Sequence, residues 1–220
     1  MKNIVAFSLT LLLLVSCGES QPKSTPITYG DTIALLQPDH SAGLTINEAL
    51  WLRASSREYS AEPLSLEELS GVMWAAAGIN RPENSHLTAP SAMALYPIKT
   101  YAFTPEGVYL YDAENHTLTL VAAGDHRTLS AAQEFAYTAP LNIVYIADLE
   151  RYEGLMHMDP AKALFLAGQD AAGYAENVNL YAAGHNLKAI TRGSLKSAEV
   201  IALLGLNNLH EVVLAQTVGK

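Results

Sequence analysis

An arginine, a serine and a second arginine occupy alternate positions of the sequence, at Arg53, Ser55 and Arg57. In an extended segment, side chains two residues apart project to the same side, so two guanidinium groups and a hydroxyl would meet there. Guanidinium groups keep their charge and bond phosphate oxygens in pairs. The spacing therefore indicates a phosphate-binding group. A solvated, polar end of a helix has the same pattern, and the spacing alone favours that simpler interpretation.

A second unusual segment is the run of small residues between Pro90 and Pro97, which contains Ser91, Ala92 and Ala94. Small side chains let the backbone N–H and C=O groups approach a flat ligand closely, and an apolar lining suits an aromatic ring system. The other interpretation is a tightly packed loop that leads into the next strand.

Familiar catalytic motifs are missing from the chain. It has no Gly-x-Gly-x-x-Gly after a strand, no phosphate loop, no His-Glu-x-x-His and no Gly-x-Ser-x-Gly. Its 7 histidines are scattered without the spacing of metal ligands, and its single cysteine cannot form an internal disulfide. The sequence therefore favours neither a hydrolase nor a metalloenzyme, and we expect no metal site.

The charge of the chain limits its partners. There are 13 Lys and Arg residues against 22 Asp and Glu residues, a formal net charge of -9, and the basic residues form no cluster. A protein that grips a phosphate backbone needs such a cluster. We therefore expect no nucleic-acid partner.

The N-terminus resembles a bacterial lipoprotein signal. Residues 1–16 combine Lys2 with an apolar run that is too short to span a membrane comfortably, and Cys17 follows directly. In such signals the leader is removed before a cysteine that carries the lipid. The expected location is the bacterial cell envelope, with the protein lipid-anchored and facing the periplasm or the exterior. An ordinary signal peptide with a coincidental cysteine is the alternative.

The residues after the signal are expected to form a tether. Residues 18–32 are polar and contain two prolines, so they cannot bury enough surface to fold alone. We assign residues 17–40 to the lipidated cysteine and its flexible tether, and residues 41–220 to one folded domain. A domain of this length buries about 70% of its unfolded surface, which is enough for a real core.

Two helices are expected to begin with the same motif. Thr45 with Glu48, and Ser65 with Glu68, each fit a capping box, in which a hydroxyl and a glutamate satisfy each other's free backbone donors. The second helix is expected to end at Gly78.

The remaining elements follow from hydrophobic periodicity. Alternating or continuously apolar stretches predict strands over 98–103, 107–111, 116–121, 141–147, 187–191 and 211–218. Apolar residues at steps of three and four predict one long Ala-rich helix within 159–186 and a shorter helix within 195–204. The predicted fold class is α+β, a mixed and mostly antiparallel sheet flanked by helices.

Several of these segments resemble, in the same order, those of the nitroreductase-like flavoprotein family. The motif Arg-x-Ser-x-Arg-x-Tyr at residues 53–59 is similar to the family's N-terminal flavin motif. Residues 90–97 resemble the sequence Pro-Ser-Ala-Gly-Ala-Leu-Tyr-Pro of one branch, the dehydrogenases that oxidise azoline rings in modified peptides. The resemblance covers roughly residues 46–220, nearly the whole folded part.

The resemblance implies an FMN enzyme with the nitroreductase-like fold, built as an intertwined homodimer with a flavin in each of two clefts between the subunits. Carried over by position, Arg53, Ser55 and Arg57 would hold the phosphate, the ribityl chain and the pyrimidine edge of FMN. A positive group near that edge stabilises the anionic reduced ring, so Arg57 would also tune the potential. Gly193 would approach N5, the atom that gains and loses hydride.

The second segment would complete the flavin site. Four of its residues would line one face of the isoalloxazine ring of the partner subunit's flavin: Pro90, Ser91, Ala92 and Ala94. The chain departs from the family pattern at Met93, where the branch has glycine, and at Arg192, where the neighbour of Gly193 is usually apolar. Arg192 would face the flavin phosphate or an anionic substrate, unless it lies on the surface.

The implied activity is that of an FMN-dependent oxidoreductase of nitroreductase or dehydrogenase type. Hydride would pass through N5 between a donor such as NAD(P)H and an unidentified small-molecule or peptide acceptor, so no side chain is nominated as a catalytic acid or base. NAD(P)H is cytosolic, so in an envelope protein a dehydrogenase that passes electrons onward is equally compatible. The alternative is a non-catalytic envelope lipoprotein that keeps the fold and binds flavin or another ligand, which the bulky Met93 and Lys188 favour.

Overall fold

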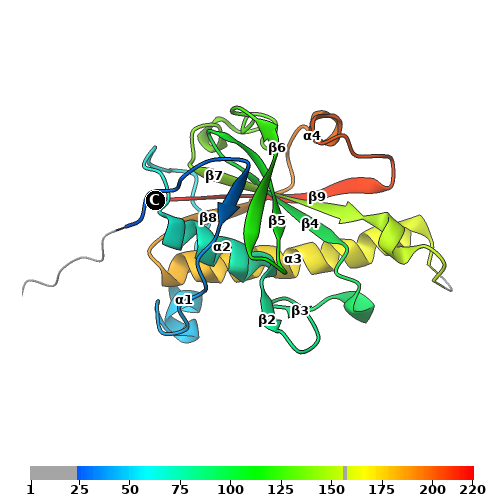
Figure 1. Cartoon of the computed structure of the whole chain (residues 1–220), viewed down its shortest axis with the longest axis horizontal. Helices are drawn as coiled ribbons and strands as arrows, with labels where there is room; N and C mark the ends of the chain where they lie inside the picture. The colour runs from blue at the N-terminus through cyan, green and yellow to red at the C-terminus, as the bar shows by residue number, and fades with distance from the viewer. Residues whose placement is uncertain (1–23, 156–157) are drawn as a thin grey trace, which may run out of the picture.

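The computed structural model describes residues 24–155 and 158–220, and within them it has one large sheet (Figure 1). The strand order of this sheet is β1-β6-β5-β4-β7-β9-β8, and every neighbouring pair is antiparallel. The seven strands are β1 (Thr32–Ala34), β4 (Ile98–Phe103), β5 (Gly107–Asp112), β6 (Thr117–Ala123), β7 (Leu141–Asp148), β8 (Lys188–Arg192) and β9 (His210–Gly219). A separate small hairpin pairs β2 (Ile79–Arg81) with β3 (His86–Leu87).

Four α-helices and three 3-10 helices complete the described residues. They are α1 (Ile46–Leu52), α2 (Leu66–Ala77), α3 (Pro160–Gly184), α4 (Ser197–Leu203), η1 (Ala92–Ala94), η2 (Glu134–Ala136) and η3 (Leu149–Tyr152). The α+β class and the mostly antiparallel sheet flanked by helices are confirmed, and each predicted strand and helix is present within a few residues of its expected bounds.

Both predicted capping boxes are formed. Thr45 begins α1 and Ser65 begins α2, and in each case the glutamate three residues later bonds back to the cap. The backbone N–H of Ser65 donates to Glu68 Oε2 at 2.7 Å. These bonds satisfy donors that a helix start leaves free, so both helices begin where the sequence predicts.

The helices cover the two faces of the sheet unequally. In Figure 1, α3 runs along one face with α2 beside it, whereas the short α4 lies on the other face. The central strand β7 is buried at all of its positions because helices cover both of its faces. The larger core lies between the sheet and α2 and α3, and Tyr145 and Tyr174 meet there edge to face, with ring centres 6.3 Å apart.

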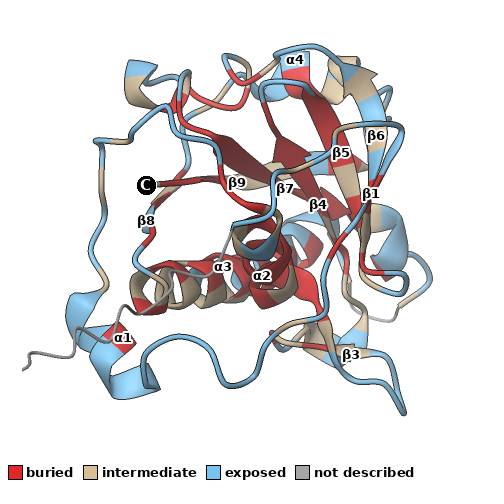
Figure 2. Cartoon of the chain, turned by 60° about the vertical axis from the view of Figure 1, so that its left-hand side comes forward, coloured by how far each residue is buried: buried red, intermediate tan, exposed pale blue. Residues whose placement is uncertain are grey.

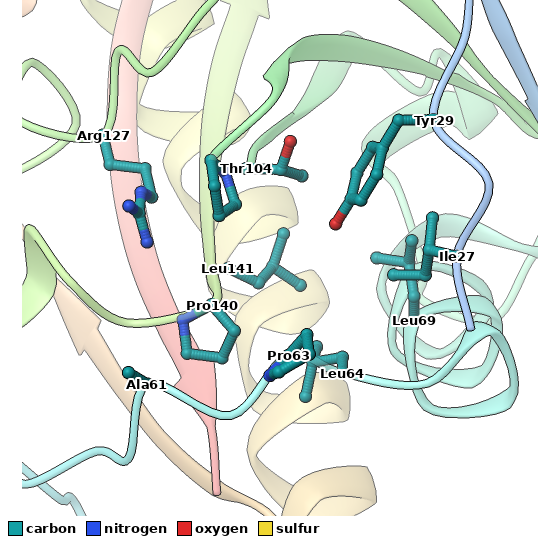
Figure 3. Close-up of a pocket in the computed structure, with 11 residues that line it drawn as sticks. Ile27, Tyr29, Ala61, Pro63, Leu64, Leu69, Thr104, Arg127, Pro140 and Leu141 are labelled. Atoms are coloured by element: carbon teal, nitrogen blue, oxygen red, sulfur yellow. The ribbon is translucent and has the colours of Figure 1, made fainter. Parts of the chain in front are cut away.

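The structure corrects the expected tether at residues 32–35, which belong to the folded domain. Ile33 is 3% exposed, and its strand β1 pairs with β6. Figure 3 shows Ile27 beside Leu69, and Tyr29 from the same segment pointing into a small cavity of about 50 Å³. A cavity of that size holds a few waters at most, so this segment closes the core rather than framing a ligand site.

Helix α1 is packed by one face only. Ala49 is its single buried residue, and Figure 2 shows the rest of the helix exposed. The exposed residues include Ile46, Leu50 and Trp51, and Trp51 is 89% exposed. Water contact with this much apolar surface is unusual for a monomer and typical of an interface.

Two sequence predictions lie outside the described residues: the signal peptide over 1–16 and the lipidation of Cys17. Within 24–155 and 158–220, no helix is long and apolar enough to span a bilayer.

We expect Ile33→Ala to lower the free energy of unfolding by about 2 to 4 kcal/mol, because it removes buried methylene groups from the core. Urea unfolding measures this loss. The control is Val121→Ala on the adjoining β6, where the side chain is 42% exposed and the change should stay within about 0.5 kcal/mol. Equal stability of the two variants would mean that the segment before α1 is a tether after all.

Candidate functional site

The chain leaves α1 in the extended form that the Arg53 motif requires. Arg53 ends the helix with φ -55° and ψ 118°. Ser55 then forms a parallel bridge with Ala189 of β8, and the N–H of Ser56 donates to the carbonyl of Ala189 at 3.1 Å. The segment therefore lies along the free edge of β8.

The two arginines of this segment carry charges that the protein does not neutralise. Arg53 is half-buried and Arg57 is exposed, and in the described part of the chain neither has an ion pair. Nearby, burial raises the pKa of the Tyr59 phenol, and the charges of Arg192 and Arg57 partly oppose that shift. The phenol is therefore close enough to both guanidinium groups to sense their positive charge, and its hydroxyl donates to the carbonyl of Ser56 at 2.8 Å.

Gly193 directly follows β8 and belongs to the same edge. It is exposed, and a Cβ built on it would meet no atom within 4 Å. Its backbone is therefore open to a ligand. Strand geometry places it about 13 Å from Ala189, so the β8 edge presents the Arg53 segment at one position and bare backbone further along.

Arg192 is buried, which corrects all three expectations for it: contact with the flavin phosphate, contact with an anionic substrate, and a place on the surface. The residue is 5% exposed. Its Nε donates to Thr217 Oγ1 at 3.0 Å, Nη1 to the carbonyl of Ser130 at 2.9 Å and Nη2 to Asn142 Oδ1 at 3.0 Å. Burial lowers the pKa of Arg192 to about 10. All three nitrogens donate to acceptors inside the protein, so the side chain braces β8 against β7 and β9.

The segment of small residues has a strained backbone. Met93, Ala94 and Tyr96 have φ values of 55°, 53° and 46°, in the left-handed region that favours glycine. Met93 is 59% exposed and stands at the position where a glycine was expected. Such strain persists only where the surrounding contacts impose it, and it concentrates at functional sites.

The hydroxyl of Ser91 points into the protein. Ser91 Oγ donates to Asp170 Oδ2 of α3 at 2.5 Å and accepts a bond from the N–H of Tyr96 at 2.8 Å. On the outer side of this segment Ala94 is exposed and Ala92 is half-buried. An open groove of about 460 Å³ adjoins it, bounded on the far side by Arg81 and His86 of the β2–β3 hairpin.

One chain does not bring the two candidate segments together. The segment of small residues contacts α3 at Asp170 and Gly173, whereas α1, which leads into Arg53, contacts it at Gly184. Eleven to fourteen helical residues separate these contacts, which is roughly 20 Å. Figure 1 likewise shows α1 at the C-terminal end of α3. Within one chain, the structure therefore places the two predicted segments at different parts of α3.

Sequence reasoning missed two residues that organise these segments, Asp170 and Tyr59. Asp170 is a lone acid in an Ala-rich helix, 5% exposed. Its place on the buried stripe, between Ala167 and Ala171, is the signal that could have revealed it. Tyr59 lies in the quoted motif, but its approach to the charge of Arg192, 133 residues further along the chain, depends on the folded sheet.

Comparison with known proteins identifies the family of this chain. Residues 52–220 match the Nitroreductase family. A Methanocaldococcus jannaschii protein described as a nitroreductase is 29% identical over 80% of this chain and 91% of its own length. The crystal structure of a Ralstonia eutropha protein described in the same way has a TM-score of 0.81 and 34% identity, covering 91% of this chain and 95% of that one.

The same fold occurs in the E. coli microcin synthetase McbBCD complex with truncated pro-MccB17 bound, at a TM-score of 0.65 and 18% identity over 84% of this chain and 77% of that one. The chain belongs to the nitroreductase family. This confirms the expected fold and the expected class, an FMN-dependent oxidoreductase.

We expect Arg192→Ala to lower the free energy of unfolding by about 2 to 3 kcal/mol, because it leaves buried acceptors unpaired and opens a cavity. Chemical denaturation measures the loss. Lys188→Ala, at the exposed start of the same strand, is the matched control and should change stability by less than about 0.5 kcal/mol. Unchanged stability of Arg192→Ala combined with lost flavin binding would restore the cofactor-binding role.

Proposed function

We propose that this protein is an FMN oxidoreductase of two half-reactions, reduced by NAD(P)H and oxidised by an acceptor that enters the same cleft. The family assignment supports FMN as cofactor and NAD(P)H as donor. Bound FMN supplies hydride transfer at N5, and the protein supplies binding, orientation and electrostatics. The observation that carries the proposal is the β8 edge, where two arginines that have no ion pair among the described residues lie on the neighbouring segment and the backbone at Gly193 is open.

The residues of this edge fit a phosphorylated cofactor. Arg53 and Arg57 would hold its phosphate and pyrimidine edge, because guanidinium groups bond phosphate and carbonyl oxygens and keep their charge. Ser55 lies between them with its backbone fixed by the bridge to Ala189. The bare backbone at Gly193 leaves room for close approach of a ring.

The proposed active form is a homodimer. The Arg53 segment and the segment of small residues lie about 20 Å apart along α3, so a second chain must supply the missing wall. The exposed apolar face of α1 supports this arrangement, since Ile46, Leu50 and Trp51 need a partner surface. Pro90, Ser91, Ala92 and Ala94 would then line the ring held by the partner.

The proposed acceptor is a small molecule or a peptide. The open groove of about 460 Å³ beside Pro90 and Ala94 could admit either. The structural likeness to a complex bound to a truncated pro-peptide supports a peptide as one candidate, in line with the branch resemblance at residues 90–97. The proposed location is the cell envelope, supported by the signal-like residues before Cys17.

A second candidate function is ligand carriage without turnover, which one observation favours. Met93 is 59% exposed and has a left-handed backbone, so its thioether occupies the space that glycine would leave open beside the ring. A protein that binds FMN but cannot admit NAD(P)H would be a carrier.

Replacing both Arg53 and Arg57 by alanine should weaken FMN binding at least about a hundredfold, because two charge-assisted hydrogen-bond donors are lost. Fluorescence titration of FMN measures this, and circular dichroism should show an unchanged fold. The control is Arg151→Ala, an exposed arginine of η3 that likewise has no ion pair within the described residues. Equal FMN affinity in the double variant would contradict the site assignment.

Met93→Gly should raise the free energy of unfolding by about 0.5 to 1 kcal/mol, because glycine adopts the left-handed conformation without the cost of a Cβ. Thermal unfolding measures this gain.

Anaerobic bleaching of bound FMN by NADPH separates the two candidate functions. If the protein is an enzyme, NADPH bleaches the FMN bound to the parent protein, which has Met93. If it is a carrier that Met93 obstructs, NADPH bleaches only the FMN bound to the Met93→Gly variant.

A further inference from the structure

Asp170 is a buried carboxylate that the proposed chemistry does not use. It lies on the sheet-facing side of α3 and is 5% exposed. Among the described residues it has no ion pair with a lysine, arginine or histidine. Burial raises the pKa of this carboxyl, while hydrogen bonds from Ser91 and Ala92 act in the opposite direction. An unpaired buried acid costs folding stability, so its presence calls for a reason.

Both carboxylate oxygens are used by one segment. Oδ2 accepts from Ser91 Oγ at 2.5 Å, and Oδ1 accepts from the backbone N–H of Ala92 at 3.3 Å. Ser91 Oγ in turn accepts from the N–H of Tyr96 at 2.8 Å. A single side chain of α3 is thereby linked to both ends of the segment Ser91–Tyr96.

Two tyrosine hydroxyls that sense the charge of Asp170 form no hydrogen bond with it. Burial is the main cause that raises the pKa values of the Tyr152 and Tyr174 phenols, and the charge of Asp170 raises both further. Yet both tyrosine hydroxyls are buried without any hydrogen-bond partner in the described structure. The hydrogen bonds that Asp170 accepts therefore come from Ser91 and Ala92 and not from these two hydroxyls.

The linked segment is the strained one. Met93, Ala94 and Tyr96 all have positive φ without being glycine, a conformation that relaxes unless something holds it. The hydrogen bonds that Asp170 accepts hold Ser91 and Ala92, which precede Met93, and Ser91 Oγ in turn holds Tyr96.

We propose that Asp170 is a positioning residue of the flavin site, which holds the Ser91–Tyr96 backbone in the strained form that faces the isoalloxazine ring. This inference rests on the proposed function, because it assumes that the segment faces a flavin. Asp170 touches no reacting atom. It acts only on the ring wall and leaves the phosphate end to Arg53 and Arg57.

The test compares FMN with riboflavin, which has the same ring but no phosphate. Asp170→Asn keeps the shape of the side chain and loses one acceptor, so we expect both ligands to bind about tenfold more weakly, with their affinity ratio unchanged. The Arg53 and Arg57 double variant should instead lose the preference for FMN over riboflavin. The matched control is Glu176→Gln, an exposed acid of the same helix, which should bind both ligands as the parent protein does.

Hydrogen exchange of the flavin-free protein provides a second readout. In Asp170→Asn the amides of residues 92–96 should exchange about tenfold faster, while those of the adjoining turns of α3 stay protected. Ser91→Ala removes the same link from the other side and should have the same effect, which covers the case in which Asp170→Asn fails to fold.

The outcomes separate the two proposals. If the parent protein binds neither flavin, the proposed function fails and the positioning role fails with it. If the parent binds flavin and Asp170→Asn and Ser91→Ala both bind and exchange as the parent does, only the positioning role is overturned. A change in the ratio of FMN to riboflavin affinity in Asp170→Asn would also overturn it, since the effect would then reach the phosphate.

Discussion

The geometry of this site depends on the hydrogen bonds that the buried guanidinium of Arg192 donates. Its three donors join β8 to Asn142 of β7, to Thr217 of β9 and to the carbonyl of Ser130. Strand β8 is an edge strand, and edge strands are weakly held unless side chains fasten them. Because β8 carries both the bridge to Ser55 and the open backbone of Gly193, fastening this strand fixes the whole candidate cofactor edge.

A second fixed point lies on α3, and it serves the other half of the site. Asp170 accepts hydrogen bonds from the Ser91 hydroxyl and the Ala92 amide. The helix that packs against the main core therefore also holds the strained segment Ser91–Tyr96. The two fixed points have opposite charges and are both desolvated. Buried charges of this kind cost stability, and each is retained here at a contact that shapes a segment of the proposed site.

Local signals made most of the fold predictable from sequence. Thr45 and Ser65 cap their helices through residues three positions away, so no distant partner was needed. Strand β1 was missed because three residues carry little periodicity and its burial comes from pairing with β6. Arg192 was misjudged for a similar reason. Its partners Ser130, Asn142 and Thr217 are 62, 50 and 25 residues away, so proximity to Gly193 in sequence gave the wrong role.

Mixed dimers test most directly the proposal that two chains share each flavin site. One chain carries Arg53→Ala with Arg57→Ala, the other carries Ala94→Trp in the exposed ring wall, and each is expected to bind no FMN alone. Co-refolded in equal amounts, half of the dimers are mixed and each has one intact site, so about a quarter of the parent FMN content should return. Failure of the mixture to recover FMN would contradict a shared site.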